Sequence, residues 1–193
     1  MPERERTKID RTIDSEEIFI RCLLKPLMKK GQCKLNQTAV LPPPNGDVVS
    51  ILRLRYISED DAVAHGQSLV VRGNSFWGIA KITYDAVDET NAWAQENESR
   101  ADGMDGPNGI QATIIASPMI NGKDYVPDGV EVYLDDKSIS FPLHAHAELK
   151  YNNCNNEEVK TRIRAYANQL IKRISYKLAN DDGDFSDWIS DLN

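Results

Sequence analysis

The segment that most constrains the fold is SFWGIAKITYDAV at residues 75–87, because it is apolar on both faces when it is drawn as a strand. Strand alternation places Phe76, Gly78, Ala80 and Ile82 on one side, and Trp77 and Ile79 on the other with Lys81. Apolar side chains on both sides are typical of a strand in the interior of a sheet. We therefore expect further strands to flank this segment.

Four other segments have strand character: VVSILRLRYI at 48–57, QATIIASPMI at 111–120, GVEVYLDD at 129–136 and SISFPLHAHAELKY at 138–151. The segment IFIRCLL at 18–24 fits both periods, since alternate residues match a strand and a different subset matches a helical stripe. The pattern predicts a mixed or antiparallel sheet of about five or six strands.

A long C-terminal helix is predicted over residues 155–179, where apolar residues recur at the helical period and no Gly or Pro interrupts. The apolar stripe consists of Val159, Ile163, Tyr166, Ala167, Leu170, Ile174 and Leu178. A shorter helix is predicted from Ser58, which caps it with Asp61 at the capping-box position, to Gly66, which ends it. Residues 88–111 are expected to form a short helical or irregular piece followed by a loop.

These elements predict an α+β fold with the long C-terminal helix packed on one face of the sheet. We expect residues 1–13 to be a flexible N-terminus, residues 14–180 to form a single domain, and residues 181–193 to form an acidic tail. The length of 193 residues is ordinary for one domain.

Composition narrows the function. The net charge of -7 disfavours general nucleic-acid binding. The start of the chain lacks an apolar signal region, and no apolar run is long enough to cross a membrane. The three cysteines have no metal-binding or redox spacing. We expect a soluble, cytoplasmic protein with no membrane association.

The segment FPLHAHAELKY at 141–151 is the first candidate site. On a strand, His144, His146 and Glu148 would share one face. Two imidazoles and a carboxylate can hold a divalent metal, or can supply a general base with an orienting acid. The alternative is an ordinary strand, because the intervening Leu143, Ala145, Ala147 and Leu149 explain the alternation without chemistry.

Arg21 is the second candidate, because it interrupts the apolar segment IFIRCLLKP. An inward-facing guanidinium would need a carboxylate or another anion beside it, since an unpaired buried charge is very unfavourable. The alternative is an arginine that points outward from an edge strand.

The C-terminal tail is the third candidate. It places four large apolar residues, Phe185, Trp188, Ile189 and Leu192, among five aspartates, directly after a helix with a basic face. Acidic segments with aromatic anchors are common in regions that fold on a partner. The tail could instead be a solubilising end, or it could fold back on its own chain.

The segments SEEIFIRCLLKP, VVSILRLRYIS, FWGIAKIT and HAHAEL resemble, in this order, small uncharacterised bacterial proteins over scattered parts of residues 15–150. Glu17 and Arg21 match an early Glu-x-x-x-Arg segment of those proteins. His144, His146 and Glu148 match a later His-Ala-His/Glu segment. The resemblance implies an accessory protein of a bacterial multi-gene system, such as a defence locus, and implies no catalytic role.

Two hypotheses follow. The first is an interaction module without cofactor that docks on a larger protein partner through its tail and its charged surfaces. The second is a small hydrolase or transferase that uses His144, His146, Glu148 and Arg21, with or without a divalent metal.

Overall fold

The computed structural model describes residues 7–24, 35–44, 46–70, 75–97, 109–120, 124–136, 141–152, 157–179 and 184–190. The strands of the main sheet lie in the order β4-β7-β2-β1-β3-β8-β9, and every pairing between them is antiparallel. Their bounds are Ala112–Ala116 for β4, His146–Tyr151 for β7, Val48–Arg53 for β2, Ile18–Leu24 for β1, Phe76–Thr83 for β3, Ser175–Leu178 for β8 and Ile189–Ser190 for β9. The α+β class is confirmed, and of the two predicted sheet types, mixed or antiparallel, the main sheet is antiparallel, with seven strands where five or six were expected.

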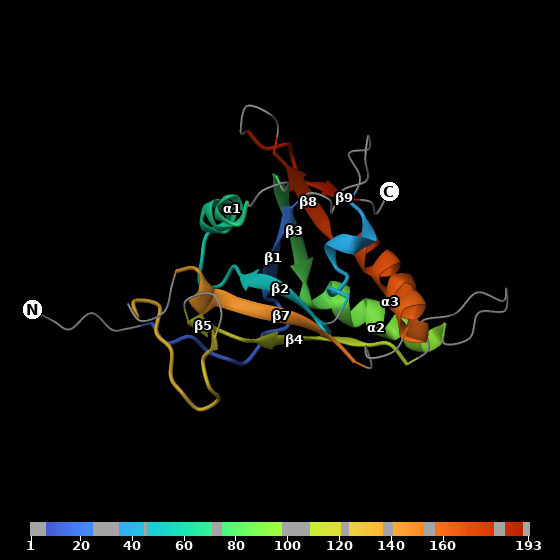
Figure 1. Ribbon diagram of the computed structural model, residues 1–193, viewed down its shortest axis with the longest axis horizontal. Helices are drawn as coiled ribbons and strands as arrows, with labels where there is room; N and C mark the ends of the chain where they lie inside the picture. The colour runs from blue at the N-terminus through green and yellow to red at the C-terminus, as the bar shows by residue number, and fades with distance from the viewer. Residues whose placement is uncertain are drawn as a thin grey trace, which may run out of the picture.

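Smaller elements complete the fold. Strands β5 (Met119–Ile120) and β6 (Asp124–Tyr125) pair in a separate hairpin. The helices are α1 (Glu59–Ser68), α2 (Tyr84–Glu96) and α3 (Glu157–Leu170). The described residues also form three short 3-10 turns, η1 (Gln37–Ala39), η2 (Leu143–Ala145) and η3 (Ile171–Arg173). Helices α2 and α3 cover one face of the sheet, and α1 lies on the other (Figure 1).

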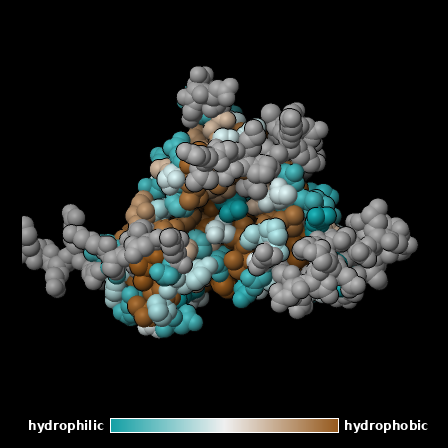
Figure 2. Space-filling view, viewed as in Figure 1, coloured by the Kyte–Doolittle hydropathy of each residue, from teal (hydrophilic) through white to brown (hydrophobic). Residues whose placement is uncertain are grey.

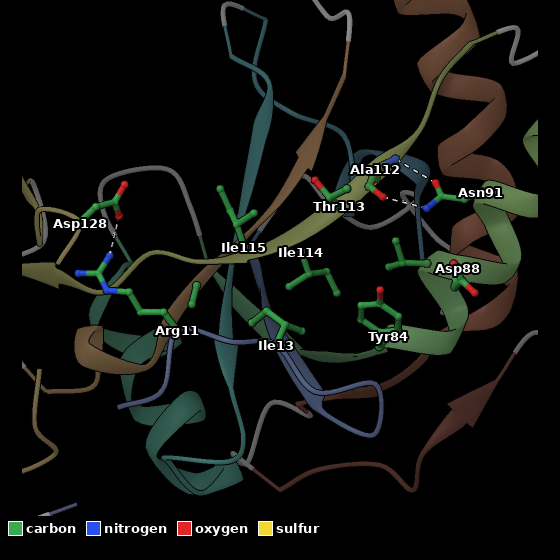
Figure 3. Close-up of a pocket in the computed structure, with 12 residues that line it drawn as sticks. Arg11, Ile13, Tyr84, Asp88, Asn91, Ala112, Thr113, Ile114, Ile115 and Asp128 are labelled. Atoms are coloured by element: carbon green, nitrogen blue, oxygen red, sulfur yellow. Dashed lines mark hydrogen bonds and ion pairs between the residues drawn. The ribbon is translucent and has the colours of Figure 1, made fainter. Parts of the chain in front are cut away.

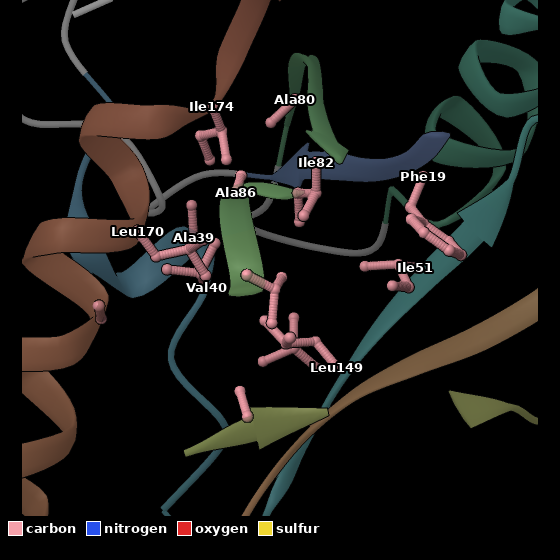
Figure 4. Packing of buried hydrophobic residues seen from close by; sticks show 14 of the residues in the cluster. Phe19, Ala39, Val40, Ile51, Ala80, Ile82, Ala86, Leu149, Leu170 and Ile174 are labelled. Atoms are coloured by element: carbon pink, nitrogen blue, oxygen red, sulfur yellow. The ribbon is translucent and has the colours of Figure 1, made fainter. Parts of the chain in front are cut away.

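Strand β3 lies inside the sheet, between β1 and β8, as its two apolar faces indicate. Its Ala80 and Ile82 enter the main core beneath α2 and α3, while Ile79 enters a second core beneath α1. The same alternation in β1 sends Phe19 to the main core and Ile20 to the second. Figure 4 shows how the main core is filled from both the sheet and the helices. Residues 18–24 are therefore a strand with both faces covered.

The prediction of one long helix over residues 155–179 is wrong. Helix α3 ends at Leu170, η3 follows, and residues 175–178 form β8. Residues four apart share a face in a strand as well as in a helix, so Ile174 and Leu178 fitted both patterns. Tyr176, which the helical stripe did not include, is fully buried in the main core. On a strand it shares a face with Ile174 and Leu178, so its burial favours the strand over the helix. Strand β3 gains a hydrogen-bonded neighbour along its second edge.

Two further expectations fail locally. Residues 129–136 form no strand, and only an isolated bridge joins Tyr133 to Lys8. The capping box of Ser58 and Asp61 is present, but α1 continues past Gly66 to Ser68. A Cβ on Gly66 would lie 2.3 Å from the ring of Phe76. Gly66 thus allows α1 to approach β3 instead of ending the helix.

The described part of the N-terminal segment is held by Arg53, which is fully buried. The guanidinium donates to both carboxylate oxygens of Glu17, with Nε–Oε1 at 2.5 Å and Nη2–Oε2 at 2.9 Å. It also donates to the backbone carbonyls of Thr12, at 2.9 Å, and Asp10. Ile9 is buried against Val126 and Val132. Within this segment, Ile9 and Ile13 therefore pack against the body of the protein, while Asp10 and Thr12 are exposed.

Candidate functional site

The histidine segment forms a strand only from His146 onward, because His144 lies in the 3-10 turn η2. His146 and Glu148 point to one side of β7, as the alternation predicted, while Ala147 and Leu149 enter the main core on the other. Ala145 departs from the prediction and packs in the second core. All three candidate side chains are buried, with exposed fractions of 2%, 4% and 6% for His144, His146 and Glu148.

His146 is fixed by Ser117. Its Nδ1 lies 2.9 Å from the backbone carbonyl of Ser117 and 3.0 Å from the hydroxyl of the same residue. A carbonyl only accepts, so Nδ1 carries the proton and donates, and the tautomer is thereby set. Nδ1 is then unable to take a proton from the Ser117 hydroxyl, which argues against a serine nucleophile activated by this contact. Burial lowers the pKa of His146, which favours its neutral form.

The two other members of the predicted set have different surroundings. Glu148 accepts a hydrogen bond from the hydroxyl of Tyr125, and this bond raises the pKa of Tyr125 to about 12. His144 stacks beside Phe141, with ring centroids 5.2 Å apart, and its Nε2 is buried without a partner among the described residues. Burial also lowers the pKa of His144. Both histidines therefore favour the neutral form at neutral pH.

Within the described ranges, no group of three or more His, Cys, Asp or Glu side chains forms a set that could hold a metal ion. Arg21 does not join the histidine set either. Its neighbours Ile20 and Cys22 belong to the second core, so Arg21 itself projects to the opposite side of the sheet from His146 and Glu148. The sheet thus separates the guanidinium from the residues that were expected to act with it.

The described part of the tail, residues 184–190, folds back on the chain itself. The ring of Phe185 meets that of Phe76 edge to face at 6.4 Å, and Trp188 packs against the second core. The ammonium groups of Lys81 and Lys177 lie 4.1 and 4.6 Å from the ring centroid of Trp188. These aromatic groups are therefore engaged within the chain.

The remaining anchors of the tail complete this arrangement. Ile189 belongs to β9, which pairs with β8 and packs against the main core. Leu192 lies outside the described residues. The tail thus closes one edge of the sheet.

The opposite edge, along β4, is a site that the sequence did not reveal. A cavity of about 420 Å³ lies against this edge, lined by residues of the N-terminal segment, of α2 and of β4 itself (Figure 3). Ile13, Tyr84 and Ile114 surround its middle, and the ion pair between Arg11 and Asp128, at 3.1 Å, lies at one end. No residue type in ATIIASP distinguishes an edge strand from an interior one, so only the topology exposes the site.

The peptide groups of β4 alternate between its two sides. The N–H of Ser117 donates to the carbonyl of His146, and the carbonyl of Gln111 accepts from Asn152, so the odd-numbered residues bond to β7. The even-numbered residues face the free edge. The first of these, Ala112, is paired with the side-chain amide of Asn91, which bonds both its N–H, at 3.0 Å, and its carbonyl, at 2.9 Å.

The next two outward-facing residues are Ile114 and Ala116. Among the described residues, no hydrogen bond reaches the outward N–H or carbonyl of either one. Both residues line the cavity. The edge of β4 therefore presents two adjacent, unoccupied pairing positions beside a space that can accept side chains.

Comparisons with known proteins do not extend this picture, since no family model, curated protein or solved structure matches the chain. In the part of the chain that the structure describes, no helix has the length and apolar character needed to cross a membrane.

Proposed function

We propose that this protein is an interaction module that captures an extended segment of a larger protein partner by adding it as a strand along β4. The observation that carries the proposal is the pair of unoccupied backbone positions at Ile114 and Ala116 beside the cavity. Exposed strand edges pair readily with other chains, and several peptide-binding folds use this mode.

The surroundings of the edge favour a particular kind of segment. Ile13, Val87 and Ile114 line the cavity and suit an apolar side chain of the incoming strand. Asp88 and Asp128 also line it, while Arg11 already pairs with Asp128. The surplus of negative charge favours a segment whose apolar residue is flanked by Lys or Arg, because charge complementarity guides association.

The expected affinity is modest. Two N–H donors and two carbonyl acceptors give about 4 kcal/mol if each net hydrogen bond contributes about 1 kcal/mol. Burial of one apolar side chain in the cavity adds about 1.5–3 kcal/mol. These terms sum to about 5.5–7 kcal/mol, which corresponds to a dissociation constant of roughly 10–100 µM, and the cost of ordering the peptide weakens the binding further.

A display library of random ten-residue peptides is the probe that tests this function. We expect the selected peptides to alternate apolar and other residues and to carry basic flanks. In the complex, amide hydrogen exchange at Ile114 and Ala116 should slow, whereas the amides of Thr113 and Ile115 are already protected by β7. Peptides that bind without slowing exchange at Ile114 and Ala116 would show that the site lies elsewhere.

A matched pair of variants sharpens the test. Ala116→Pro removes the outward N–H but no bond to β7, and should weaken peptide binding at least about fivefold. Ala116→Val keeps the N–H at the same position and should bind within about twofold of the parent. Equal binding by both variants would contradict strand addition. If Ala116→Pro does not fold, the exchange measurement on the parent protein decides the question alone.

The tail and the histidine segment have smaller roles in this proposal. Phe185, Trp188 and Ile189 pack on the chain itself, so we assign partner capture to β4 and not to the tail. The bacterial multi-protein setting implied by the resemblance stays a prediction, and a partner encoded beside this protein would supply the natural strand. The hydrolase or transferase hypothesis has less support, and elemental metal measurement of the purified protein tests its metal-dependent form.

A further inference from the structure

Arg21 has an unusual position for a guanidinium. It lies half-buried on the side of the sheet that α3 covers. Its Nε donates to the carbonyl of Ala39 at 3.2 Å, and its Nη1 donates to the carbonyl of Ser50 at 2.9 Å. These two bonds hold the planar group in a fixed orientation. They leave donors of the guanidinium unused, because arginine carries five N–H groups.

The charge of Arg21 has no counterion in the described part of the chain. Its two acceptors are neutral carbonyls, and none of the ion pairs formed by the described residues includes it. Burial lowers the pKa of Arg21, and no carboxylate contributes to raising it. The group stays protonated at any ordinary pH, so a partly desolvated positive charge remains to be balanced.

A cavity of about 690 Å³ opens beside this guanidinium. Its floor is formed by β2, its far side by Ile163 and Arg164 of α3, and its rim by the proline turn at residues 42–44. Thr38 and Ser50 add polar groups. Apolar surface gathers in the middle of the face seen in Figure 2, where the sheet and α3 meet.

The lining of the cavity carries two positive charges, Arg21 and Arg164, and no carboxylate among the described residues. This balance is notable in a chain whose net charge is -7. The remaining lining is largely apolar and includes Leu41, Val49 and Ile163. A volume in the range of about 300–1,000 Å³, mostly apolar with a few fixed polar groups, is typical of small-molecule sites.

We infer that this cavity binds a small organic anion, with its phosphate or carboxylate group on Arg21 and Arg164 and its apolar body against the proline turn and Ile163. A guanidinium fork matches the oxygens of both anions in a two-point hydrogen bond. The prolines present a rigid apolar wall that loses little conformational freedom on binding. The sequence predicts that Arg21, if it faces inward, needs an anion beside it. The structure supplies the cavity and the second cation.

Titration of isotope-labelled protein with four probes tests the inference: phenyl phosphate, benzoate, inorganic phosphate and the neutral benzyl alcohol. We expect phenyl phosphate or benzoate to shift the backbone amide resonances of Val49, Ser50 and Ile163 in a saturable way. The better of these two identifies the anionic group. Inorganic phosphate should bind at least about tenfold more weakly, because it lacks the apolar body. Equal shifts with benzyl alcohol, or no shift with any probe, would overturn the inference.

Three variants assign the binding to the two arginines. Arg21→Met should weaken binding of the better probe by about 10–100-fold, since a hydrogen bond to a charged group contributes about 1.5–3 kcal/mol. Arg164→Gln, at an exposed position, should weaken it about two- to fivefold. Arg162→Gln removes the same charge from the same helix outside the cavity lining and should change affinity less than twofold.

The stability of Arg21→Met separates binding from folding. The variant loses the hydrogen bonds to the carbonyls of Ala39 and Ser50, but it also removes a charge that has no carboxylate partner among the described residues. Because these two effects oppose each other, the variant without ligand should unfold at a urea midpoint close to that of the parent. Unchanged probe binding by Arg21→Met would refute the inference. If that variant fails to fold, unchanged probe binding by Arg164→Gln refutes it instead.

Discussion

Glu17 and Arg53 form a buried ion pair whose disruption should destabilise the whole domain. Arg53 is fully buried and Glu17 is 6% exposed, so neither charge has access to water. Replacing Glu17 with Ala removes the only carboxylate beside the guanidinium among the described residues and leaves it with the carbonyls of Asp10 and Thr12 and the ring of Tyr56. Removal of one partner from a buried pair costs about 3–5 kcal/mol, which is a large part of the stability of an ordinary domain.

Urea unfolding, followed by far-ultraviolet circular dichroism and by tryptophan fluorescence, measures this effect. With a slope of about 1–3 kcal/mol per molar urea, the midpoint of Glu17→Ala should fall by roughly 1–5 M. The control is Glu89→Ala. Its carboxylate also pairs with an arginine, Arg173, but its side chain is 68% exposed. That variant should change the free energy of unfolding by less than about 1 kcal/mol.

The double variant Glu17→Leu/Arg53→Met distinguishes the charge from the packing. Replacing both charges with apolar groups should recover most of the loss, because apolar pairs of similar volume are often as stable as buried ion pairs. The carbonyls of Asp10 and Thr12 still lose their donor, so trypsin should cleave after Arg11 faster than in the parent. A loss below about 1 kcal/mol for Glu17→Ala alone would refute the reasoning.

Three further predictions use the same unfolding assay. Burial lowers the folded-state pKa of His144 and His146, so the unfolded chain binds protons more readily than the folded protein. The free energy of unfolding should be at its full value above about pH 7 and should fall as the pH drops through about 6.5. A smaller fall in His146→Asn than in the parent would assign the effect to His146. Gly78→Ala should destabilise by more than about 3 kcal/mol, because φ is +145° and a Cβ would lie 1.9 Å from the carbonyl oxygen of Lys177; an unchanged urea midpoint would contradict this. Trp188→Ala should lose about 1–3 kcal/mol of packing and cation–π energy and should increase trypsin cleavage after Lys177, whose ammonium contacts the ring. Unchanged cleavage would show that the ring does not hold the tail.

The sequence predicts a helix or strand correctly where the local residue pattern and the packing in the folded protein favour the same structure. The two apolar faces of residues 76–82 predicted an interior strand, and the capping box at Ser58 predicted the start of α1, because both signals are local. The pattern failed at residues 174–178, where i and i+4 positions serve a helix and a strand equally well. These residues form a strand because they pair with the second edge of β3, and that edge exists only in the assembled sheet.

For the candidate sites too, some features follow from local sequence patterns and others depend on the assembled sheet. The shared side of His146 and Glu148 follows from strand alternation and was predictable. The contact of His146 with Ser117 joins residues 29 positions apart in sequence, and no local pattern in either segment predicts it. The separation of Arg21 from the histidines depends on which face of the sheet each strand presents to the main core. The order of strands fixes that relation, so a single sequence does not reveal it.

The treatment of the two sheet edges is the strongest argument for assigning function to β4. An open sheet exposes unpaired backbone groups at both ends, and proteins usually cover them. At one end, residues 185–190 return to the body of the protein and pack their aromatic rings on it, and only Ile189–Ser190 form the edge strand β9. At the other end, the side-chain amide of Asn91 bonds the first outward peptide group of β4, and no described residue hydrogen-bonds the outward groups of Ile114 and Ala116. A chain that closes one edge with its own terminus and leaves the other open beside a cavity has the arrangement that an incoming strand requires.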